Sequence, residues 1–296
     1  MPANNSYNVS KNVNMANLKQ SIERVNDSFM NAIGLANDIP ACIEAILQGR
    51  FPEGKELTES WQSLHNRIIL GNFQGIHIGD YKEITLTTGE EVVMEVAGID
   101  TYRKGCKKEV IHHIDFISRD CLFEAHRMNQ TDTNVGTDDI KWPWLSSEMY
   151  STLNDETNGI YSTLPDNLKP YIIEKNARYE QHYFSEDLQN TYKGFDWIDI
   201  GKLWLPTEVE IFGHTCCSNI KCGSGGGCNM RYPIFEFSTD HIIKGKGKNG
   251  SDTTYYISNI ADSNTTSFCY VDHHGSVDGW YNASRALNIP LCFRIA

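Results

Sequence analysis

The C-terminal segment Ser267–Ala296, SFCYVDHHGSVDGWYNASRALNIPLCFRIA, carries the strongest fold signal in the chain. Its two ends, Phe268–Val271 and Leu291–Ile295, are short runs of aromatic and aliphatic residues, a composition that favours strands. His274-Gly275 marks a turn after the first run, because glycine adopts backbone angles that other residues avoid. A polar stretch follows the turn. We therefore expect the chain to end in a strand that closes a β-rich domain.

The residues that precede this block predict both helices and strands. Thr58–Leu70 carries Trp61, Leu64 and Ile68 at the spacing of one helix face. From Gly71 the apolar residues alternate with polar ones, which is the period of a strand. The further expected strands are Ile76–Ile78, Tyr81–Leu86, Val92–Val96 and Val110–Ile117, and the further expected helices are Ser146–Leu153 and Leu164–Ala177.

Two later apolar segments, Phe235–Ile243 and Thr253–Ile260, flank a polar tip. Asn249-Gly250 within that tip favours a hairpin turn. Helices and strands thus occur in separate groups along the chain and do not alternate. This order predicts an α+β domain.

The N-terminal part differs in character from the rest. Its first residues are polar and without period, and they predict a flexible arm. An apolar seam follows at the a/d spacing of a coiled coil, formed by Leu18, Ile22, Val25 and Phe29. The seam is compatible with an oligomerising bundle and also with one amphipathic helix that packs on its own domain. We therefore predict an arm and anchor helix over 1–50 and a second domain over 51–296.

Composition excludes several classes of protein. The formal net charge of the 296 residues is −12, whereas nucleic-acid binding favours a basic face that releases counterions from phosphates. No apolar run is long enough to span a bilayer, and the N-terminus lacks the apolar core of a signal peptide. We expect a protein that is made in the cytoplasm and has neither nucleic-acid nor membrane partners.

The sharpest candidate for metal chemistry is a cysteine-rich loop. Cys217, Cys222 and Cys228, with Cys216 beside them, could supply thiolates to zinc. Their spacings of four and five differ from the two-residue spacing of zinc knuckles. A disulfide formed after release from the cell and a loop of free thiols are the other interpretations. We predict no metal and no cofactor.

Two further patterns offer polar side chains to a site. His113 and Asp115 would share one face of a strand and could donate metal ligands, but hydrogen-bonded or solvent-facing imidazoles are the simpler interpretation of this pattern. Glu208 and Glu210 would also share a strand face. For them we predict one structural glutamate that binds backbone amides of a loop and one exposed neighbour. No phosphate-binding loop or nucleophile elbow occurs in the sequence, so we predict no catalytic residue.

Aromatic side chains are the best candidates for binding. Trp280 and Tyr281 follow the predicted turn that contains His273 and His274. Large aromatic side chains supply much of the binding energy at protein surfaces. These four residues form the predicted recognition rim.

Seven stretches in this order resemble an uncharacterised family of C-type-lectin-like domains. They are Ile78–Tyr81, Trp144–Asn154, Leu164-Pro165, Leu203–Val209, Tyr255–Ser258, Val271–Gly275 and Ile289–Ile295. The family occurs in surface proteins of Gram-positive bacteria and in their phages and prophages. The resemblance covers about Trp61 to Ala296. The sequence departs from the family where Tyr255 and Tyr256 replace tryptophan and where the loop from Cys216 to Cys228 is inserted.

The resemblance implies a small twisted antiparallel sheet with long loops, in which the chain end pairs back near the centre of the sheet. It carries no catalytic activity over to this chain. Trp280-Tyr281-Asn282 does not match the calcium-binding motif of true lectins, so calcium-dependent sugar binding is not implied.

A surface module made in the cytoplasm, with an anchor segment in front, suits a phage or prophage virion. We therefore expect a non-enzymatic structural protein, either a receptor-binding part of the tail or a capsid decoration protein. Its expected partners are other virion proteins, further copies of itself and a host glycan or protein. An interaction module unrelated to a particle and a thiol-oxidising or metal-dependent enzyme are the alternatives.

Overall fold

The computed structural model describes residues 54–101, 112–184, 191–219, 231–237, 239–247 and 250–296. The described residues of 54–72 and 78–296 form one compact unit, here called the larger unit, and residues 73–77 fall outside it. Helices and strands both build the larger unit, which confirms the predicted mixed α+β class. The predicted anchor helix, with its seam of Leu18, Ile22, Val25 and Phe29, lies outside the described residues.

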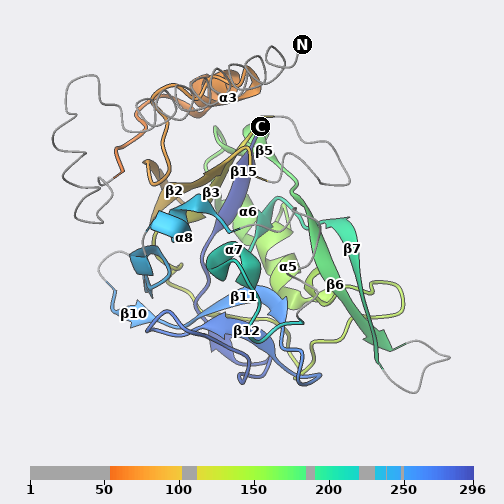
Figure 1. Cartoon of the computed structure of the whole chain (residues 1–296). Helices are drawn as coiled ribbons and strands as arrows, with labels where there is room; N and C mark the ends of the chain where they lie inside the picture. The colour runs from red at the N-terminus through yellow and green to blue at the C-terminus, as the bar shows by residue number, and fades with distance from the viewer. Residues whose placement is uncertain (1–53, 102–111, 185–190, 220–230, 238, 248–249) are drawn as a thin grey trace, which may run out of the picture. The chain divides into compact units, whose positions relative to one another are not determined.

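The larger unit is organised by one curled antiparallel sheet in the order β1–β2–β3–β15–β5, and β8 also pairs with β15 (Figure 1). Its strands are β1 (Tyr81–Thr85), β2 (Glu91–Ile99), β3 (Ile114–Ser118), β15 (Cys292–Ile295), β5 (Ile172–Ile173) and β8 (Leu203–Trp204). The register of β2 against β3 shifts between Val96 and Gly98. Such a bulge bends a strand and increases its twist, which accounts for part of the curl.

The last strand of the chain lies inside this sheet. β15 pairs with β3, where Phe293 lies opposite Phe116 and Arg294 opposite Asp115. It also pairs with β5 and β8. The predicted closing strand is therefore confirmed, and its neighbours come from three distant parts of the chain.

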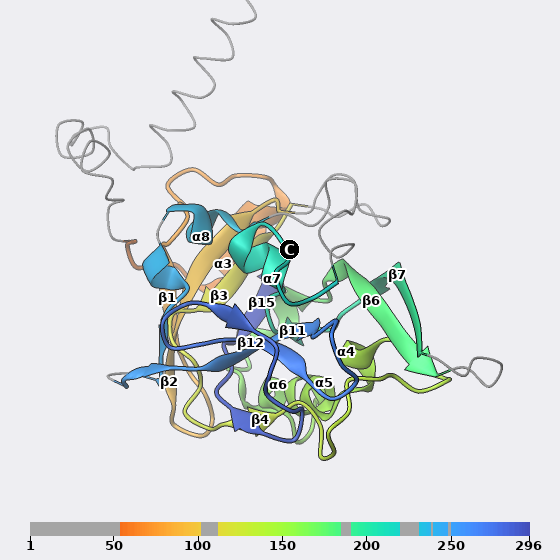
Figure 2. The same ribbon diagram turned by 60° about the horizontal axis from the view of Figure 1, so that its bottom comes forward.

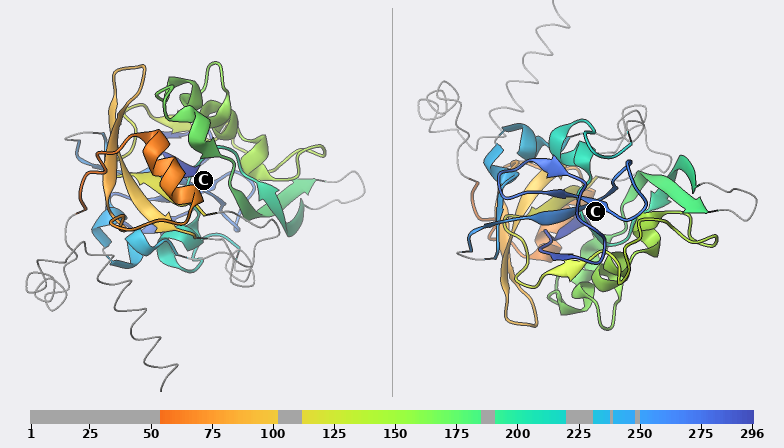
Figure 3. Two further views of the ribbon diagram at one scale, coloured as in Figure 1. Left: turned by 90° about the horizontal axis from the view of Figure 1, so that it is seen from above. Right: turned by 90° about the horizontal axis from the view of Figure 1, so that it is seen from below.

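One face of the β3–β15 pair is apolar and is covered by α3 (Trp61–Ile69). Ser60 begins this helix by accepting a hydrogen bond from the backbone N–H of Ser63. Trp61 packs edge-on against Phe116 and Phe293, with ring centroids 5.7 and 6.1 Å away. Figure 3 shows α3, in orange, lying across the strands beside the C-terminus. The helix predicted over Thr58–Leu70 is thus confirmed.

The opposite face of the same pair is ionic, because adjacent residues of a strand point to opposite sides. Asp115 and Arg294 are both fully buried. Arg294 donates from Nε to Asp115 Oδ1 at 2.6 Å and from Nη2 to Asp115 Oδ2 at 2.8 Å. Burial alone would raise the pKa of Asp115, but the charge and hydrogen bonds of Arg294, with help from His113 and Lys175, lower that pKa to about 2.

A second buried ion pair continues from the first. The Tyr232 hydroxyl donates to Asp115 Oδ2 at 3.0 Å and accepts a hydrogen bond from Lys175 Nζ at 2.7 Å. Lys175 also forms an ion pair with Glu210, and both side chains are almost completely buried. The Lys175 ammonium lies 4.7 Å from the ring centroid of Trp204, within cation–π distance. Two carboxylates, two cations and a phenol are therefore connected by hydrogen bonds inside the protein.

The remaining strands form smaller sheets. The largest is the sheet β11 (Tyr255–Ile260), β12 (Phe268–Val271) and β13 (Val277–Asp278). The two-stranded sheets are β9 (Lys244–Gly245) with β10 (Asp252–Thr253), β4 (His126–Arg127) with β14 (Ala286–Leu287), and β6 (Asn176–Phe184) with β7 (Thr191–Asp199). Figure 2 shows β11 beside β12, and the β6–β7 hairpin extending away from them. The hairpin predicted around Asn249-Gly250 is confirmed by β9 and β10, although Asn249 itself lies outside the described residues.

The helices that follow α3 are short. They are α4 (Pro143–Ser146), α5 (Glu148–Asn154), α6 (Ile160–Thr163), α7 (Glu208–Phe212) and α8 (Pro233–Phe237), with 3₁₀ turns η1 (Lys169–Tyr171) and η3 (Thr239–His241). Helix α5 confirms the prediction over Ser146–Leu153. Across the ranges that the structure describes, no helix has the length and apolar character needed to cross a membrane.

Three predicted elements are wrong. Leu164–Ala177 is not a helix, because Pro170 removes a backbone donor and the β-branched Ile172 and Ile173 join the sheet as β5. Phe235–Ile243 is not a strand, since Pro233 begins the helix α8 and a 3₁₀ turn follows. Ile76–Ile78 is not a strand either, because Gly75 and Gly79 on its two sides have φ angles of 71° and 87°.

Deleting Leu291–Ala296 should abolish cooperative unfolding of the protein. The deletion removes strand β15 and leaves β3, β5 and β8 without their common partner. It also removes Phe293 from the core, and loss of one such side chain alone costs about 3–5 kcal/mol. Thermal unfolding followed by circular dichroism would test this expectation. A soluble truncated protein with a sharp melting transition would contradict it.

Asp115→Asn should destabilise the protein by about 3–5 kcal/mol at neutral pH, because it leaves Arg294 as an unpaired buried charge. The pKa of Asp115 is lower in the folded protein, about 2, than in the unfolded chain, about 3.9. The ionised carboxylate therefore contributes stability above the unfolded pKa that is lost as the pH falls toward the folded pKa. The difference between wild type and variant should shrink by about 2–3 kcal/mol on acidification.

Urea unfolding across the acid range would measure this change. Asp166→Asn is the matched control, because the Asp166 side chain is 96% exposed and pairs with Lys169 at the surface. Its effect should remain below about 1 kcal/mol. A gap between wild type and Asp115→Asn that stays constant with pH would argue against a lowered pKa.

Candidate recognition surface

The residues of the predicted rim lie at two ends of the β12–β13 hairpin. His273 and His274 occupy the turn between the strands, with their ring centroids 3.9 Å apart, and both are exposed. Gly275 in this turn has a φ angle of 83°, as predicted from the His-Gly pair. Trp280 and Tyr281 come after β13, beyond the other end of the hairpin. The structure therefore separates the histidines from the two aromatic residues by the length of the hairpin.

Tyr281 is the middle layer of a stack. Its ring is parallel to that of Tyr270, with centroids 4.2 Å apart and an interplanar angle of 11°. Arg285 Cζ lies 3.7 Å from the centroid of the Tyr281 ring. Because two groups this close cannot share one face of a ring, Tyr270 and Arg285 cover opposite faces. Tyr281 therefore has no free ring face to offer a ligand, and it supports Arg285 instead.

Trp280, in contrast, is exposed over 79% of its surface. The loop that carries it is held from several directions. The Tyr256 hydroxyl donates to the backbone carbonyls of Asn282 and Arg285 at 3.0 and 2.9 Å. Asp132 accepts hydrogen bonds from the Asn282 side chain at 2.9 Å and from the Ser284 backbone at 3.2 Å. An exposed indole on a loop with this many restraints is presented with little conformational freedom.

Glu208 stabilises a second loop, residues 216–218, which packs next to the loop of Trp280. It lies in the first turn of α7, which Thr207 and Glu210 begin as a capping box. The buried Glu208 carboxylate accepts hydrogen bonds from the backbone N–H groups of Cys216 at 2.7 Å, Cys217 at 2.8 Å and Ser218 at 3.0 Å, and from the Ser218 hydroxyl. The predicted structural glutamate is therefore confirmed. We call residues 216–218 with Glu208 the Glu208 clamp.

The environment of the two glutamates differs from the prediction in two respects. They lie on a helix, because the capping box starts α7 at Glu208, and not on a strand. Glu210 is also buried and paired with Lys175, whereas we predicted an exposed neighbour. The sequence gives no local sign of Lys175 as the partner, since the two residues are 35 positions apart.

The Glu208 clamp reaches the Trp280 loop through Cys217 and Gly279. The Cys217 sulfur lies 3.8 Å from the Val277 carbonyl. A Cβ atom added at Gly279 would lie 3.6 Å from the Cys217 Cβ and only 2.8 Å from the Ala261 Cβ. Gly279, the residue before Trp280, thus allows a close approach to Ala261 that a larger residue would prevent, and it lies next to Cys217 of the clamp.

The cysteines of the clamp are poorly suited to bind a metal. Burial and the nearby Glu208 carboxylate raise the pKa of Cys217 to about 11 and also raise that of Cys216. Metal ligation and nucleophilic attack both need the thiolate. Cys222 and Cys228 lie outside the described residues. Within the parts of the chain that are described, no three His, Cys, Asp or Glu side chains converge as metal ligands would.

The other histidine pattern has a structural role. His112 Nδ1 lies 2.7 Å from Asp100 Oδ2. His113 is fully buried and hydrogen-bonded to the backbone carbonyl of Thr101. The expected hydrogen-bonded imidazoles are therefore confirmed.

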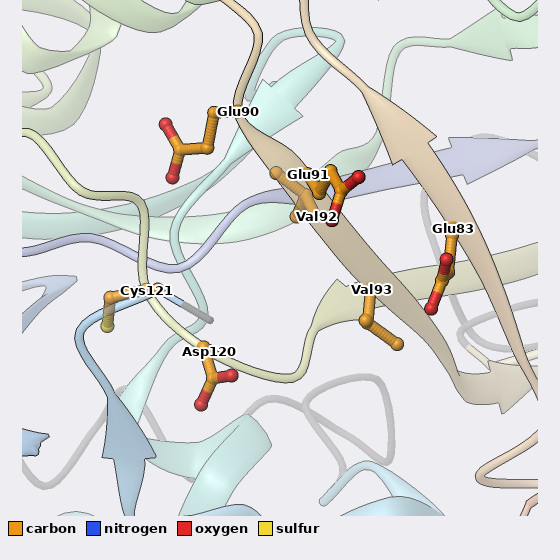
Figure 4. Close-up of a pocket in the computed structure, with 8 residues that line it drawn as sticks. Glu83, Glu90, Glu91, Val92, Val93, Asp120 and Cys121 are labelled. Atoms are coloured by element: carbon orange, nitrogen blue, oxygen red, sulfur yellow. The ribbon is translucent and has the colours of Figure 1, made fainter. Parts of the chain in front are cut away.

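An acidic crevice between β2 and a loop is a second candidate site (Figure 4). Glu83, Glu90, Glu91 and Asp120 line it together with Val92, Val93, Cys121 and Gly247, and its volume is about 30 Å³. Glu90 and Asp120 bind the backbone N–H groups of Phe123 and Gly245. Figure 4 shows Glu83 and Glu90 on either side of Glu91 and Val92, so their carboxylates do not converge. The crevice has room for about one water molecule and does not form a cation site.

Comparison with known proteins identified no homologue of this chain. No family model, no curated protein and no solved structure matches this chain. The function of this chain must therefore be inferred from the chemistry of the site itself.

Glu208→Gln should loosen the loop at residues 216–218. The substitution replaces one carboxylate oxygen by an N–H₂ group that faces backbone donors, so at least one hydrogen bond is lost at a cost of about 1–3 kcal/mol. Removing the negative charge also removes one cause of the raised pKa of Cys217. We therefore expect faster alkylation of Cys217 and faster amide exchange at residues 216–218, both measured by mass spectrometry.

Glu236→Gln is the matched control for this variant, because Glu236 is exposed on α8. It should change neither rate. Equal alkylation rates of Cys217 in the wild type and Glu208→Gln would show that Glu208 does not hold the loop.

Proposed function

We propose that this protein is a non-enzymatic binding module of C-type-lectin-like architecture that forms part of a phage or prophage virion. The observation that carries the proposal is the exposed indole of Trp280 on a loop that side-chain and backbone hydrogen bonds restrain. Aromatic side chains held in this way are typical of recognition surfaces, because little entropy is lost when they bind.

The arrangement of the sheet supports a lectin-like architecture. The C-terminal strand β15 lies beside β3 in the main sheet, and helix α5 precedes it in the chain. A separate sheet, β11–β12–β13, carries the loop of Trp280. A chain end that pairs back inside a curled antiparallel sheet agrees with what the family resemblance implies.

The contacts of the buried polar side chains favour a binding function over a catalytic one. Asp115, Lys175 and Glu210 bind one another or Arg294 and Tyr232. The Glu208 carboxylate is saturated by a loop, and the pKa of Cys217 is raised. These groups stabilise the fold, and a thiol-oxidising mechanism would need a more acidic cysteine.

The placement in a particle is supported by sequence features. The chain carries a predicted anchor segment over 1–50, and the family that it resembles occurs in phages and prophages. In this proposal the anchor contacts other capsid or tail proteins and further copies of the chain, and the larger unit faces outward. A tail receptor-binding protein and a capsid decoration protein both fit this arrangement.

The test is to purify particles after prophage induction and to measure the protein by quantitative mass spectrometry. We expect it in a fixed ratio to the major capsid or tail protein. Antibody labelling viewed by electron microscopy should then mark either heads or tails. Absence from purified particles would overturn the virion proposal, and binding through Trp280 would then favour an interaction module unrelated to a particle.

A further inference from the structure

Strand β7 has an outer edge that no strand of the described chain covers. It pairs with β6 along all nine of its residues, and β6 is its one partner among the described sheets. In Figures 1 and 2 β7 lies on the side of the hairpin that faces away from the main sheet. Such an edge presents backbone N–H and C=O groups that can pair with a further strand.

The contacts of β6 show which residues of β7 face this edge. The His182 N–H donates to the Lys141 carbonyl, and the His182 carbonyl accepts from the Gly136 N–H, so the backbone of His182 faces away from β7. Position 182 lies opposite 193 in β7, and backbone groups alternate in direction along paired strands. The odd-numbered positions of β7, which include Phe195 and Trp197, therefore direct their N–H and C=O groups outward.

Two aromatic side chains accompany this edge. Phe195 and Trp197 are two residues apart, so they share one face of the strand, and both are partly exposed. Arg178 lies opposite Trp197, and its Cζ is 5.3 Å from the ring centroid of Phe195. Aromatic residues and arginine are enriched in protein–protein interfaces. The edge of β7 thus has the composition of a contact with another polypeptide.

The outer edges of the main sheet are better protected than β7. Strand β5 at one end has two residues. At the other end, the backbone of Tyr81 in β1 is bonded to Lys55 and Leu57, and the outward position that follows is Glu83, an exposed charge. Short strands and charged side chains discourage pairing with a further strand. The central outward residue of β7, Phe195, is uncharged.

We propose that the outer edge of β7 pairs with the same edge of a second copy of this chain, so that two hairpins form one antiparallel sheet across a twofold axis. A symmetric dimer uses the same patch on both copies, and a strand that pairs antiparallel with itself meets this condition. With the axis at Phe195, the Phe195 N–H of each copy donates to the Phe195 carbonyl of the other, because opposite residues of a hydrogen-bonded pair exchange both bonds.

The side chains of β7 favour self-pairing in this register. The two Phe195 side chains lie side by side, and aromatic pairs across strands stabilise a sheet. Asp196 lies opposite Gly194, which has no side chain. An axis moved to Asp196 would set two carboxylates opposite each other, which destabilises a sheet. Backbone pairing also needs no charge from either copy, which matters for a chain with a formal net charge of −12.

Sedimentation equilibrium of the full-length protein over a range of concentrations measures this dimer. Phe195→Pro removes the outward N–H and leaves the bonds to β6, because proline is tolerated where the N–H of an edge strand faces solvent. It should weaken dimerisation by about tenfold or more, since the symmetric pair loses two hydrogen bonds. Glu83→Pro is the matched control at the edge of β1 and should change the affinity by less than about twofold. Thermal melting checks that both variants are folded.

A disulfide trap tests the register and does not depend on the proline variant. The Cα atoms of opposite residues in a hydrogen-bonded pair are about 5.5 Å apart, which is within the range of a disulfide. Phe195→Cys should therefore form a 195–195 link between two copies under mild oxidation, identified by peptide mass spectrometry. Trp197→Cys is the control, because its two copies lie on opposite sides of the axis and should not link.

Three results would each overturn the proposal. They are a wild-type protein that stays monomeric at every concentration, self-association that is unchanged in Phe195→Pro, and equal yields of the 195–195 and 197–197 links. Association through the N-terminal seam alone would give the second result. The dimer does not depend on a place in a virion, so the presence or absence of the protein in particles leaves this test unaffected.

Discussion

The buried pair of Asp115 and Arg294 is the interaction on which the rest of the larger unit depends. It joins β3 to the last strand across 179 positions of sequence. Removing two charges from water costs several kcal/mol per ion, and only good geometry with further hydrogen bonds offsets that cost. The two bonds of Arg294 to both oxygens of Asp115, and the Tyr232 hydroxyl, provide that geometry. The closing strand is thus held by a specific contact as well as by its apolar face.

From this pair a continuous set of polar contacts leads to the surface. Tyr232 connects Asp115 to Lys175, and Lys175 connects to Glu210 on α7. Two residues earlier on α7, Glu208 holds the loop at Cys217. Helix α7 therefore directs one buried glutamate to Lys175 and the other to the loop at residues 216–218. The ionic core fixes the helix, the helix fixes the loop, and the loop packs under Gly279 beside Trp280.

This arrangement divides the polar residues between two roles. The buried charges of Asp115, Arg294, Lys175 and Glu210 bind one another and Tyr232, and they contribute to stability. The candidate recognition surface presents the indole of Trp280 and the guanidinium of Arg285, which are poor acids and bases at neutral pH, and the exposed imidazoles of His273 and His274. A module of this kind is suited to binding a partner at its surface, and the proposed role in a virion requires such binding.

The sequence by itself determined the strands at both ends of Ser267–Ala296, helix α3, helix α5 and the amide-binding role of Glu208, because each leaves a local pattern of spacing, capping or composition. The sequence also predicted Trp280 as part of a recognition rim. Only the tertiary structure decided that Ile172 and Ile173 form a strand, that Glu210 is buried against Lys175 and that Tyr281 lies between Tyr270 and Arg285. These features depend on partners that are distant in sequence or lie on a folded loop, and local spacing carries no information about such contacts.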